Sequence, residues 1–362
     1  ELNFLYIIFS RFDLLFIQTK NESHIMIFKK IITSIFVFLQ SFITTQAARE
    51  ETYAEQDSWK KLQNRMPENY RLDSSHQPQE YFWRWKENNI HVDYYPRPNS
   101  TAKVILLHGV GTNGRQMSLI LGHPLAQAGY ETIALDLPGY GMSQYPSKSK
   151  IRYDDWVQLV SDFVDAEAKK DDRPIFLYGL SAGGMLTIHV AMQNKNIKGV
   201  IGMTFLDQQR IDVQKGTMRF SYLSPILLSG MQIAAMTPIG NIRLPMSLVS
   251  KMYALTNDKE ALKIMQRDST SAGNSMSIQF LKSYMFYKPK YDLSRFTQCP
   301  VLLTQPAEDH WTPLALSQPV LDRLTVAKQV VMLPKGGHYP VEVEALEQLR
   351  KSSIAFIQQY SK

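Results

Sequence analysis

Apolar and polar positions follow two different patterns along the chain. Between residues 81 and 95, aromatic and β-branched residues alternate with polar ones, which predicts an antiparallel pair of strands at a sheet edge. Beyond residue 100, apolar residues come in short unalternating runs that end in glycine or a polar turn and are followed by stretches of helical spacing. These runs are 104–107, 132–135, 175–178, 200–205, 301–304 and 330–333. Strands that are apolar on both faces and separated by helices predict a mostly parallel sheet covered on both sides, an α/β fold.

Helical spacing marks two long helices and one insertion. Apolar residues form a single stripe between residues 153 and 168, and a second stripe over 346–360 predicts a closing C-terminal helix. Between the fourth and fifth apolar runs no further apolar strand occurs, and prolines and glycines divide the segment into short helices. We interpret residues 207–298 as a helical cap inserted into a core made of residues 79–206 and 299–362.

The N-terminal region has the pattern of a targeting signal. Residues 1–25 are an aperiodic mixture broken by charges, which we interpret as upstream translation without structure. From Met26, two lysines precede an apolar run, and Thr45 and Ala47 place small residues at positions minus three and minus one of a cleavage site. We therefore expect residues 26–47 to be a signal peptide and the protein to be exported, periplasmic or secreted. The alternative is an uncleaved membrane anchor, although the run is shorter than the roughly 20 residues that cross a bilayer.

Composition narrows the classes of function. A chain of 362 residues with 44% hydrophobic and 20% charged residues suits one large domain with an insertion, and residues 48–78, rich in charged and amide side chains, form a lead-in to it. The net charge of +7 comes without a block of lysine or arginine, so we expect no nucleic acid, while peripheral contact with a membrane is permitted. Cys299 is the single cysteine, which excludes an internal disulfide and a cysteine metal site. We expect no metal, no organic cofactor and no obligate protein partner.

A G-x-S-x-G motif follows the third apolar run and opens a helix. A turn from strand to helix at one residue forces a strained backbone and brings neighbouring segments close together. Side chains at Gly179 and Gly183 would therefore collide, while Ser181 projects from the tip of the strand. The start of the helix directs amide N–H groups at any negative charge that develops there. We predict Ser181 as a nucleophile.

The end of the first apolar run supplies a second element of the same chemistry. His108 and Gly109 follow the strand directly, and Val110 comes next. A tetrahedral oxyanion needs two donors that are already in place, and the backbone N–H groups of Val110 and Ala182 are the candidates. We expect His108 to hold this loop and not to transfer protons.

The last two strands each run into a loop that carries a candidate partner for the serine. Asp309 follows the strand 301–304, and His338 follows the strand 330–333 and a pair of glycines. Imidazole, with an unperturbed pKa of about 6.5, can accept the serine proton and return it to a leaving group near neutral pH. We predict His338 as the base and Asp309 as the acid that orients it. Asp207, which closes the strand before the cap, is the alternative acid.

With these motifs in this order, the chain resembles the α/β-hydrolase superfamily from about residue 81 to its C-terminus. The loop 136–143 and the glycine-glycine-histidine turn at 336–338 also match this superfamily. Within it, the chain is most similar to the capped group of lysophospholipases, monoacylglycerol lipases and serine aminopeptidases. Ala182 stands where a proline iminopeptidase has tryptophan, and Ser181 differs from the aspartate nucleophile of epoxide hydrolases and haloalkane dehalogenases.

The cap favours a lipid-like ester as the substrate. It contains eight of the sixteen methionines, whose flexible thioethers suit a fatty acyl chain, although a small lid also needs a core of its own. The resemblance implies a carboxylic ester hydrolase that acts through a Ser-His-Asp triad and an acyl-enzyme. One alternative is a peptidase or amidase with the same triad, for which we expect an acidic cluster in the cap; the cap acids are scattered. A second alternative is a non-catalytic binding protein, against which the complete set of triad and oxyanion positions argues.

Overall fold

The computed structural model describes residues 52–361, so the expected upstream segment and signal peptide lie outside the described residues. Within residues 52–361, no helix has the length and apolar character needed to span a bilayer.

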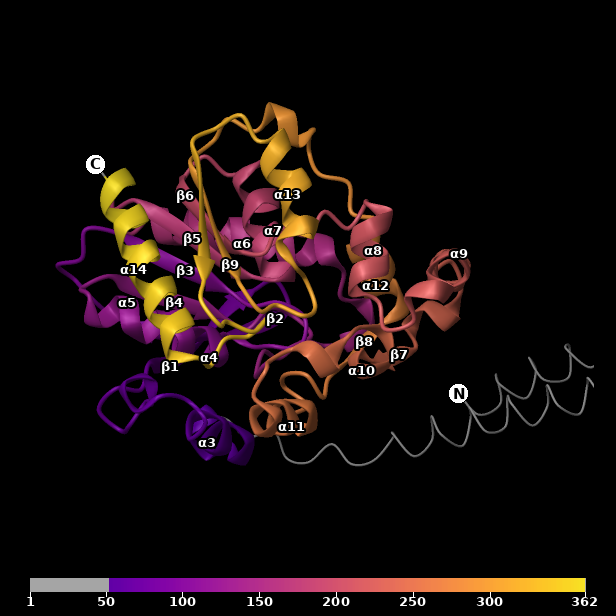
Figure 1. The fold of residues 1–362 in the computed structure, drawn as a ribbon, viewed down its shortest axis with the longest axis horizontal. Helices are drawn as coiled ribbons and strands as arrows, with labels where there is room; N and C mark the ends of the chain where they lie inside the picture. The colour runs from indigo at the N-terminus through magenta and orange to yellow at the C-terminus, as the bar shows by residue number, and fades with distance from the viewer. Residues whose placement is uncertain (1–51, 362) are drawn as a thin grey trace, which may run out of the picture. The chain divides into compact units, whose positions relative to one another are not determined.

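Eight strands form one sheet with the order β1-β2-β4-β3-β5-β6-β9-β10 (Figure 1). The pairs β1/β2 and β2/β4 are antiparallel and the other neighbours are parallel. The predicted α/β fold with a mostly parallel sheet is confirmed. The strands are β1 (Gln79–Trp85), β2 (Asn88–Tyr95), β3 (Lys103–Leu107), β4 (Glu131–Leu135), β5 (Ile175–Leu180), β6 (Ile197–Met203), β9 (Val301–Pro306) and β10 (Lys328–Leu333).

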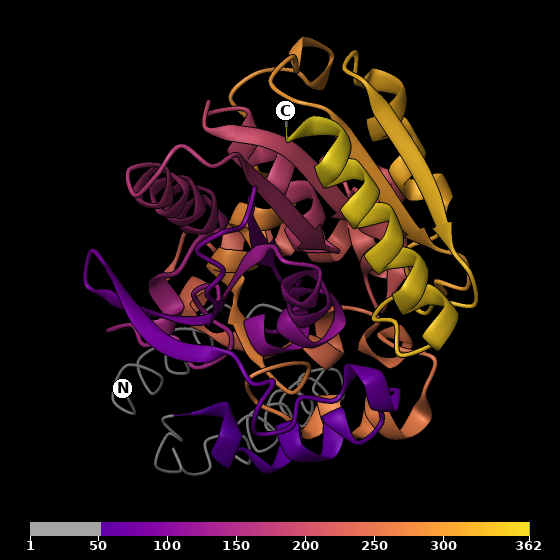
Figure 2. The same cartoon turned by 90° about the vertical axis from the view of Figure 1, so that its left-hand side faces the viewer.

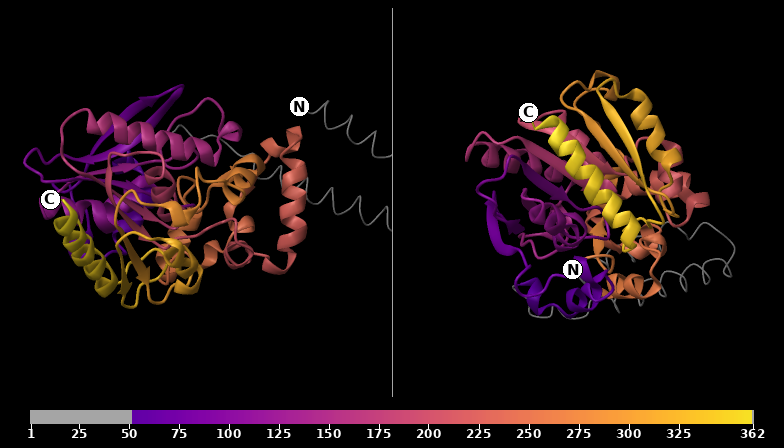
Figure 3. Two further views of the ribbon diagram at one scale, coloured as in Figure 1. Left: turned by 90° about the horizontal axis from the view of Figure 1, so that it is seen from above. Right: turned by 60° about the vertical axis from the view of Figure 1, so that its left-hand side comes forward.

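Helices cover the two faces of this sheet. The C-terminal helix packs with α5 against one face, while α6 and α7 pack together on the other (Figures 2 and 3). The predicted stripe of α6 is buried, with Trp156, Val160 and Phe163 turned inward. The helices of the core are α4 (Gly114–Met117), α5 (His123–Gln127), α6 (Tyr153–Ala168), α7 (Ala182–Ala191), α13 (Leu314–Arg323) and α14 (Val343–Tyr360). Short 3-10 turns lie at Tyr53–Glu55, Glu68–Tyr70, Lys148–Lys150, Ser221–Leu223, Pro238–Asn241, Met252–Ala254 and Leu293–Arg295, and a π turn at Ser118–Gly122.

The last strand differs from the prediction that every apolar run is covered on both faces. Along β10 exposed and less exposed residues alternate, and Val330 and Met332 are 47% and 43% exposed. The reason is position, because β10 is the edge of the sheet and α14 packs against it from one side. An apolar run at a sheet edge therefore has an open face that its sequence does not reveal.

Residues 207–298 add no strand to the eight-stranded sheet and contain several short helices. They also contain a two-stranded antiparallel sheet, β7 (Arg243–Pro245) with β8 (Ser275–Ser277), which the sequence pattern did not predict. Strands of three residues are too short to leave a periodic signal. The helices are α8 (Ile211–Thr217), α9 (Ser224–Ala234), α10 (Met246–Val249), α11 (Lys259–Arg267) and α12 (Ile278–Met285).

The lead-in is more deeply packed than its polar composition indicated. Its helix α3 (Asp57–Gln63) buries Trp59 and Leu62 and contacts α11 of the cap. Gln56 donates a hydrogen bond from Nε2 to Oδ1 of Asp268 at 3.1 Å. The lead-in thus contacts the cap through α3 and Gln56, and the core through the hydrogen bond from Tyr53 to Asp136.

Candidate active site

Ser181 lies at the turn between β5 and α7, in a backbone conformation that residues other than glycine rarely adopt. Its φ is 57° and its ψ is −117°, which is strained for a residue with a Cβ. Its backbone N–H donates to the carbonyl of Met203 at 2.8 Å, and its carbonyl accepts from the N–H of Gly184 at 2.9 Å. These bonds fix the turn, so the hydroxyl is held at the end of the strand.

Glycines allow the neighbouring segments to approach this turn. A Cβ at Gly179 would lie 2.0 Å from the carbonyl oxygen of Gly183, a distance that no side chain tolerates. A Cβ at Gly109 would lie 2.8 Å from the Cβ of Ser181. The loop after β3 therefore rests directly on the serine turn, and it can do so only with glycine at this position.

Two backbone N–H groups flank the serine. Ala182 is the first residue of α7, so its N–H has no partner inside the helix. Among the described hydrogen bonds, none has the N–H of Val110 as donor. A Cβ on Gly109 would lie 3.3 Å from the nitrogen of Ala182, which places the Val110 loop and the helix start side by side. Both predicted oxyanion donors are thus near Ser181, and neither is used in a hydrogen bond between the described residues.

Both ring nitrogens of His108 are used within the loop. Nδ1 bonds to the carbonyl oxygen of Gly109 at 2.8 Å, and Nε2 accepts from the backbone N–H of Leu137 at 2.9 Å. Burial lowers the pKa of His108 to about 4, which keeps the ring neutral near neutral pH. A neutral ring with both nitrogens bonded holds the loop and has no nitrogen left for proton transfer.

Asp309 and His338 form a buried pair. Oδ2 of Asp309 lies 2.8 Å from Nδ1 of His338, and the same carboxylate accepts from the backbone N–H groups of Trp311 at 2.9 Å and Thr312 at 2.7 Å. Burial raises the pKa of Asp309, but the charge of His338 and these hydrogen bonds outweigh it and leave the value at about 2. The carboxylate is therefore ionised and fixed in direction.

The other nitrogen of His338 is free. Nε2 is buried and has no hydrogen-bond partner among the described residues. The structure therefore joins Asp309 to His338 but shows no hydrogen bond between His338 Nε2 and the hydroxyl of Ser181. The three residues follow β5, β9 and β10, parallel strands whose carboxyl ends meet at one edge of the sheet. In hydrolases, such contacts often tighten only when a substrate is bound.

Asp207, the alternative acid, has a different partner. Its Oδ2 accepts a hydrogen bond from Nη1 of Arg323 at 3.1 Å, and its Oδ1 accepts from the N–H of Gln209 at 3.1 Å. The histidine is instead paired with Asp309. The geometry thus favours Asp309 over Asp207 as the orienting acid.

The sequence analysis missed two residues of the acid loop. The hydroxyl of Thr312 donates to Oδ2 of Asp309 at 2.7 Å and lies 2.9 Å from Nδ1 of His338. The ring of Trp311 packs 4.7 Å from that of His338, and its Nε1 donates to the carbonyl of Thr217 in the cap at 3.2 Å. Their position two and three residues after the acid was the only available signal.

An apolar cavity begins at the serine and continues under the cap. From the core it is lined by Val110, Ser181, Leu206 and Trp311, and from the cap by residues that include four methionines: Met218, Met231, Met246 and Met285. These four are half of the methionines that the sequence analysis singled out. No carboxylate belongs to the described lining of this cavity. The cavity therefore suits an uncharged apolar group placed next to the hydroxyl.

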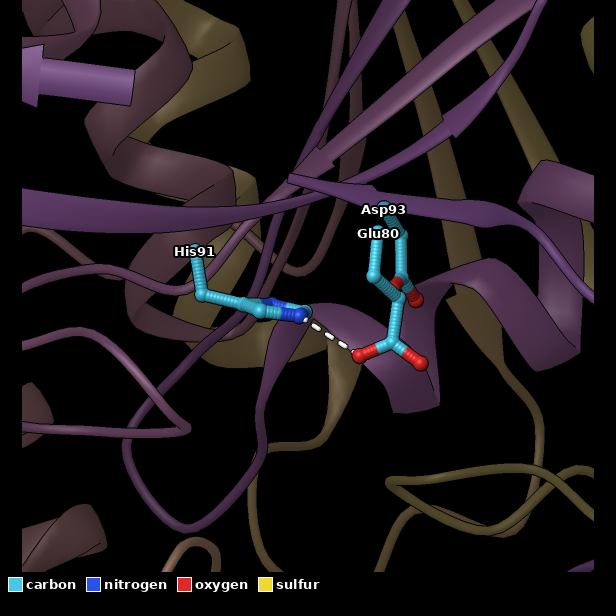
Figure 4. A group of neighbouring side chains, drawn as sticks. All are labelled: Glu80, His91 and Asp93. Carbon is cyan, nitrogen blue, oxygen red and sulfur yellow. Dashed lines mark hydrogen bonds and ion pairs between the residues drawn. The ribbon is translucent and has the colours of Figure 1, made fainter. Parts of the chain in front are cut away.

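A second group of polar side chains has the composition of a metal site. Glu80, His91 and Asp93 lie close enough to share an ion, and a dashed line in Figure 4 joins His91 to Glu80 at 2.8 Å. Arg115, however, already binds Asp93 at 2.6 Å and Glu80 at 2.8 Å. A metal would have to displace this guanidinium, so the residues fit an internal ion-pair network better than a metal centre.

The fold is that of an α/β hydrolase. The family model described as serine aminopeptidase, S33, matches residues 98–342. This range spans most of the sheet and the whole cap, and the chain belongs to that family.

The proteins to which the chain is similar include lipases. The chain is 25% identical over 241 residues to a thermostable monoacylglycerol lipase of Bacillus sp. (strain H-257), covering 66% of this chain and 84% of the relative. It is 30% identical over 122 residues to phospholipase YtpA of Bacillus subtilis, covering 33% of this chain and 42% of that protein. A soluble variant of the monoglyceride lipase from Saccharomyces cerevisiae, solved with a substrate analog, superposes with a TM-score of 0.66 at 19% identity, covering 82% of this chain and 99% of that one. This structural likeness supports the fold.

Proposed function

We propose that this protein is a serine hydrolase that cleaves carboxylic esters of lipid-like acyl groups, as in monoacylglycerols or lysophospholipids. The observation that carries the proposal is the apolar cavity that begins at Ser181 and is lined on its other side by residues of the cap. An acyl chain in this cavity would place its ester carbonyl at the serine hydroxyl. The similarity to a monoacylglycerol lipase and a phospholipase supports the same class of substrate.

In the proposed acylation step, Oγ of Ser181 attacks the ester carbonyl carbon while Nε2 of His338 takes the hydroxyl proton. The free Nε2 supports this role, because a base needs a nitrogen with no other partner. Asp309 holds Nδ1 and stabilises the imidazolium that forms. The N–H groups of Val110 and Ala182 would bind the oxyanion.

The tetrahedral intermediate formed by this attack then breaks down to the acyl-enzyme. The bond from the carbonyl carbon to the alcohol oxygen breaks, and the alcohol leaves with the proton carried by His338. In the second half, water attacks the acyl carbon and gives one proton to His338. The bond between that carbon and Oγ of Ser181 then breaks, His338 returns the proton to Oγ, and the fatty acid leaves. The serine hydroxyl is restored and no cofactor enters the reaction.

The cavity favours an ester over a peptide with a free amine. An aminopeptidase has to bind a substrate ammonium group, which is strongly stabilised by a buried carboxylate. No carboxylate lines the described cavity, and Asp207 nearby is paired with Arg323. The acidic cluster expected for a peptidase is therefore not found around Ser181 among the described residues.

Hydrolysis of two substrate series tests the proposal. With p-nitrophenyl esters of increasing acyl length, we expect kcat/KM to rise from acetate to medium-chain esters, because each added methylene gains apolar contact in the cavity. Aminoacyl p-nitroanilides should be cleaved far more slowly. Ser181→Ala should reduce esterase activity by about 10³-fold or more. Faster turnover of the anilides, or full esterase activity in Ser181→Ala, would refute the proposal.

We also propose that residues 26–47 direct export. N-terminal sequencing of the mature protein from the producing cell tests this point. We expect the mature chain to begin at Ala48, whereas retention of Met26 in a membrane fraction would favour the uncleaved anchor.

A further inference from the structure

The outer side of the cap carries an unusual stretch of exposed apolar residues. Residues 220–242 contain no charged side chain and no histidine. In α9, only Ser224 is buried. Ile226 is 72% exposed, Ile233 69% and Met236 84%, values far above those of Val330 and Met332 on the open face of β10. The α9 surface is defined by Tyr222, Ile226, Ile233, Met236, Ile239 and Ile242. Burying such large apolar side chains against a partner would be favourable, and an exposed patch of this kind marks an interaction site.

The α9 surface lies at the edge of the molecule and next to the cavity. In Figure 1 and in the left panel of Figure 3, α9 is at the outer end of the cap, farther from the sheet than α8 and α12. Leu228 and Met231, from the same helix, line the cavity that begins at Ser181. One helix therefore faces the surroundings on one side and the proposed acyl site on the other.

The charged residues that flank the α9 surface in the sequence are mostly positive. Residues 208–251 contain five bases (Arg210, Lys215, Arg219, Arg243 and Lys251) and one acid (Asp212), so their net charge is +5 − 1 = +4. Asp212 is paired with Arg210 at 2.9 Å, which neutralises the acid. An apolar surface bordered by bases is complementary to a lipid surface that carries negative charge.

We propose that the α9 surface docks onto an anionic lipid bilayer, with its apolar side chains in the headgroup and acyl boundary and the flanking bases at the lipid phosphates. Docking there would bring the cavity wall formed by Leu228 and Met231 to the membrane. This inference concerns binding, and it stands whether or not the protein hydrolyses lipids.

A second copy of the chain is a poorer occupant of the same surface. In a symmetric dimer each copy would present the same patch, so a net charge of +4 would face a net charge of +4. The α9 surface also consists of a single helix with the short turns on either side of it, and it lies at the outer end of the cap. An anionic bilayer meets no such repulsion, because its charge is negative.

A fluorescent label on the α9 surface tests the docking directly. Ile233→Cys in the full chain is labelled with an environment-sensitive NBD fluorophore, and Val330→Cys is the matched control, because Val330 is an exposed apolar residue on β10. The native Cys299 is buried, which raises its pKa to about 12 and keeps it unreactive. The label reports its own surroundings, so contact of any other segment with lipid does not change the reading.

We expect the NBD emission at position 233 to shift to shorter wavelength and rise severalfold with phosphatidylcholine vesicles that contain phosphatidylserine. The change should be smaller with phosphatidylcholine alone and absent at position 330. No change at position 233, or an equal change at position 330, overturns the proposal. A blue shift at position 233 that depends on protein concentration without vesicles, with a dimer in sedimentation velocity, assigns the surface to a second copy and also overturns it.

The double variant Ile226→Ser/Ile233→Ser gives an independent readout, with Val330→Ser/Met332→Ser as the control. We expect the former to lower vesicle partitioning by about tenfold or more, because two exposed side chains that would enter the bilayer on docking lose their apolar contact with it. The latter should leave partitioning unchanged. Hydrolysis of a soluble short-chain ester should be equal in both. Equal partitioning of the two variants contradicts the docking, whereas absence of esterase activity in both and in the wild type contradicts the proposed function alone.

Discussion

Two buried histidines in this molecule bind a carboxylate at the same distance but differ in what their second nitrogen does. His338 Nδ1 lies 2.8 Å from Asp309, and His91 Nε2 lies 2.8 Å from Glu80. The second nitrogen of His338 has no hydrogen-bond partner in the described part of the chain, whereas that of His91 lies 3.0 Å from Oδ2 of Asp136. The comparison teaches that a histidine and a carboxylate do not by themselves define a proton-transfer site. An uncommitted nitrogen beside a cavity is also required.

The surroundings of His91 show why its group is structural. Burial lowers the pKa of His91, but Asp136 and Glu80 outweigh it and raise the value to about 10. The ring is thus a cation near neutral pH and cannot act as a base. The hydroxyl of Tyr53 donates to Asp136 at 2.9 Å and Arg115 closes the network, so this group fixes the lead-in to the core.

The largest expected effect comes from His338→Asn. The variant removes Nε2, the nitrogen proposed to take the proton of Ser181, so kcat/KM for a p-nitrophenyl ester should fall by about 10⁴-fold or more. The melting temperature should change little, because the amide N–H of asparagine can replace Nδ1 in the hydrogen bond to Asp309, and Nε2 has no hydrogen-bond partner among the described residues. If His338→Asn kept a tenth of the wild-type activity, a group other than His338 would be the base.

Asp309→Asn should come next, with a loss of about 10³-fold to 10⁴-fold in kcat, because an amide does not stabilise the imidazolium. The folded-state pKa of about 2 lies below the ordinary value of 3.8, so the ionised carboxylate stabilises the wild type above pH 4. That contribution is lost as the pH falls from about 4 to about 2, and it should be missing from acid unfolding curves of Asp309→Asn. The matched variant Asp207→Asn should keep its activity within a few fold.

His91→Gln should act on stability and not on chemistry. Removing the cation leaves buried carboxylates unpaired, which should cost about 3–5 kcal/mol in the free energy of unfolding while the folded fraction keeps its kcat. Because the folded pKa of about 10 lies above the ordinary 6.5, the stabilisation is fully present below pH 6.5 and is lost as pH rises toward 10. Urea titrations across this range should show the decline in the wild type and not in His91→Gln. A loss of kcat without a loss of stability would contradict the structural assignment.

The smallest expected effect is that of Thr312→Val. The variant keeps the shape of the side chain but removes the hydroxyl that bonds Asp309 and lies beside Nδ1 of His338. One lost hydrogen bond to a charged group should lower kcat by about tenfold with KM unchanged. Thr325→Val, whose hydroxyl bonds a backbone carbonyl away from the site, is the control. Equal kcat in the two variants would show that Thr312 does not position the pair.

Much of the fold follows from local pattern. The unalternating runs predicted the parallel strands, because a strand buried on both faces needs apolar residues throughout. The glycines around Ser181 predicted the sharp turn because a Cβ there would collide with the backbone. The S33 family match, which shows that the chain is an α/β hydrolase, agrees with the resemblance inferred from these motifs.

Other features depend on partners that are distant in sequence and leave no spacing. Trp59 is buried, although the polar composition of the lead-in gave no sign that this segment packs against the rest of the protein. Arg115 forms ion pairs with Glu80 on β1 and Asp93 on β2, and these partners come together only in the folded sheet. Thr312 and the open face of β10 likewise become visible only when the loops and the sheet edge are placed in space.

The most direct test of the central claim is the site of a fluorophosphonate adduct, mapped by mass spectrometry of the digested protein. We expect a phosphonylated Ser181 in the wild type, and labelling slowed by several orders of magnitude in His338→Asn but not in His91→Gln. An adduct on a different residue, or labelling of Ser181 at the wild-type rate in His338→Asn, would contradict the claim.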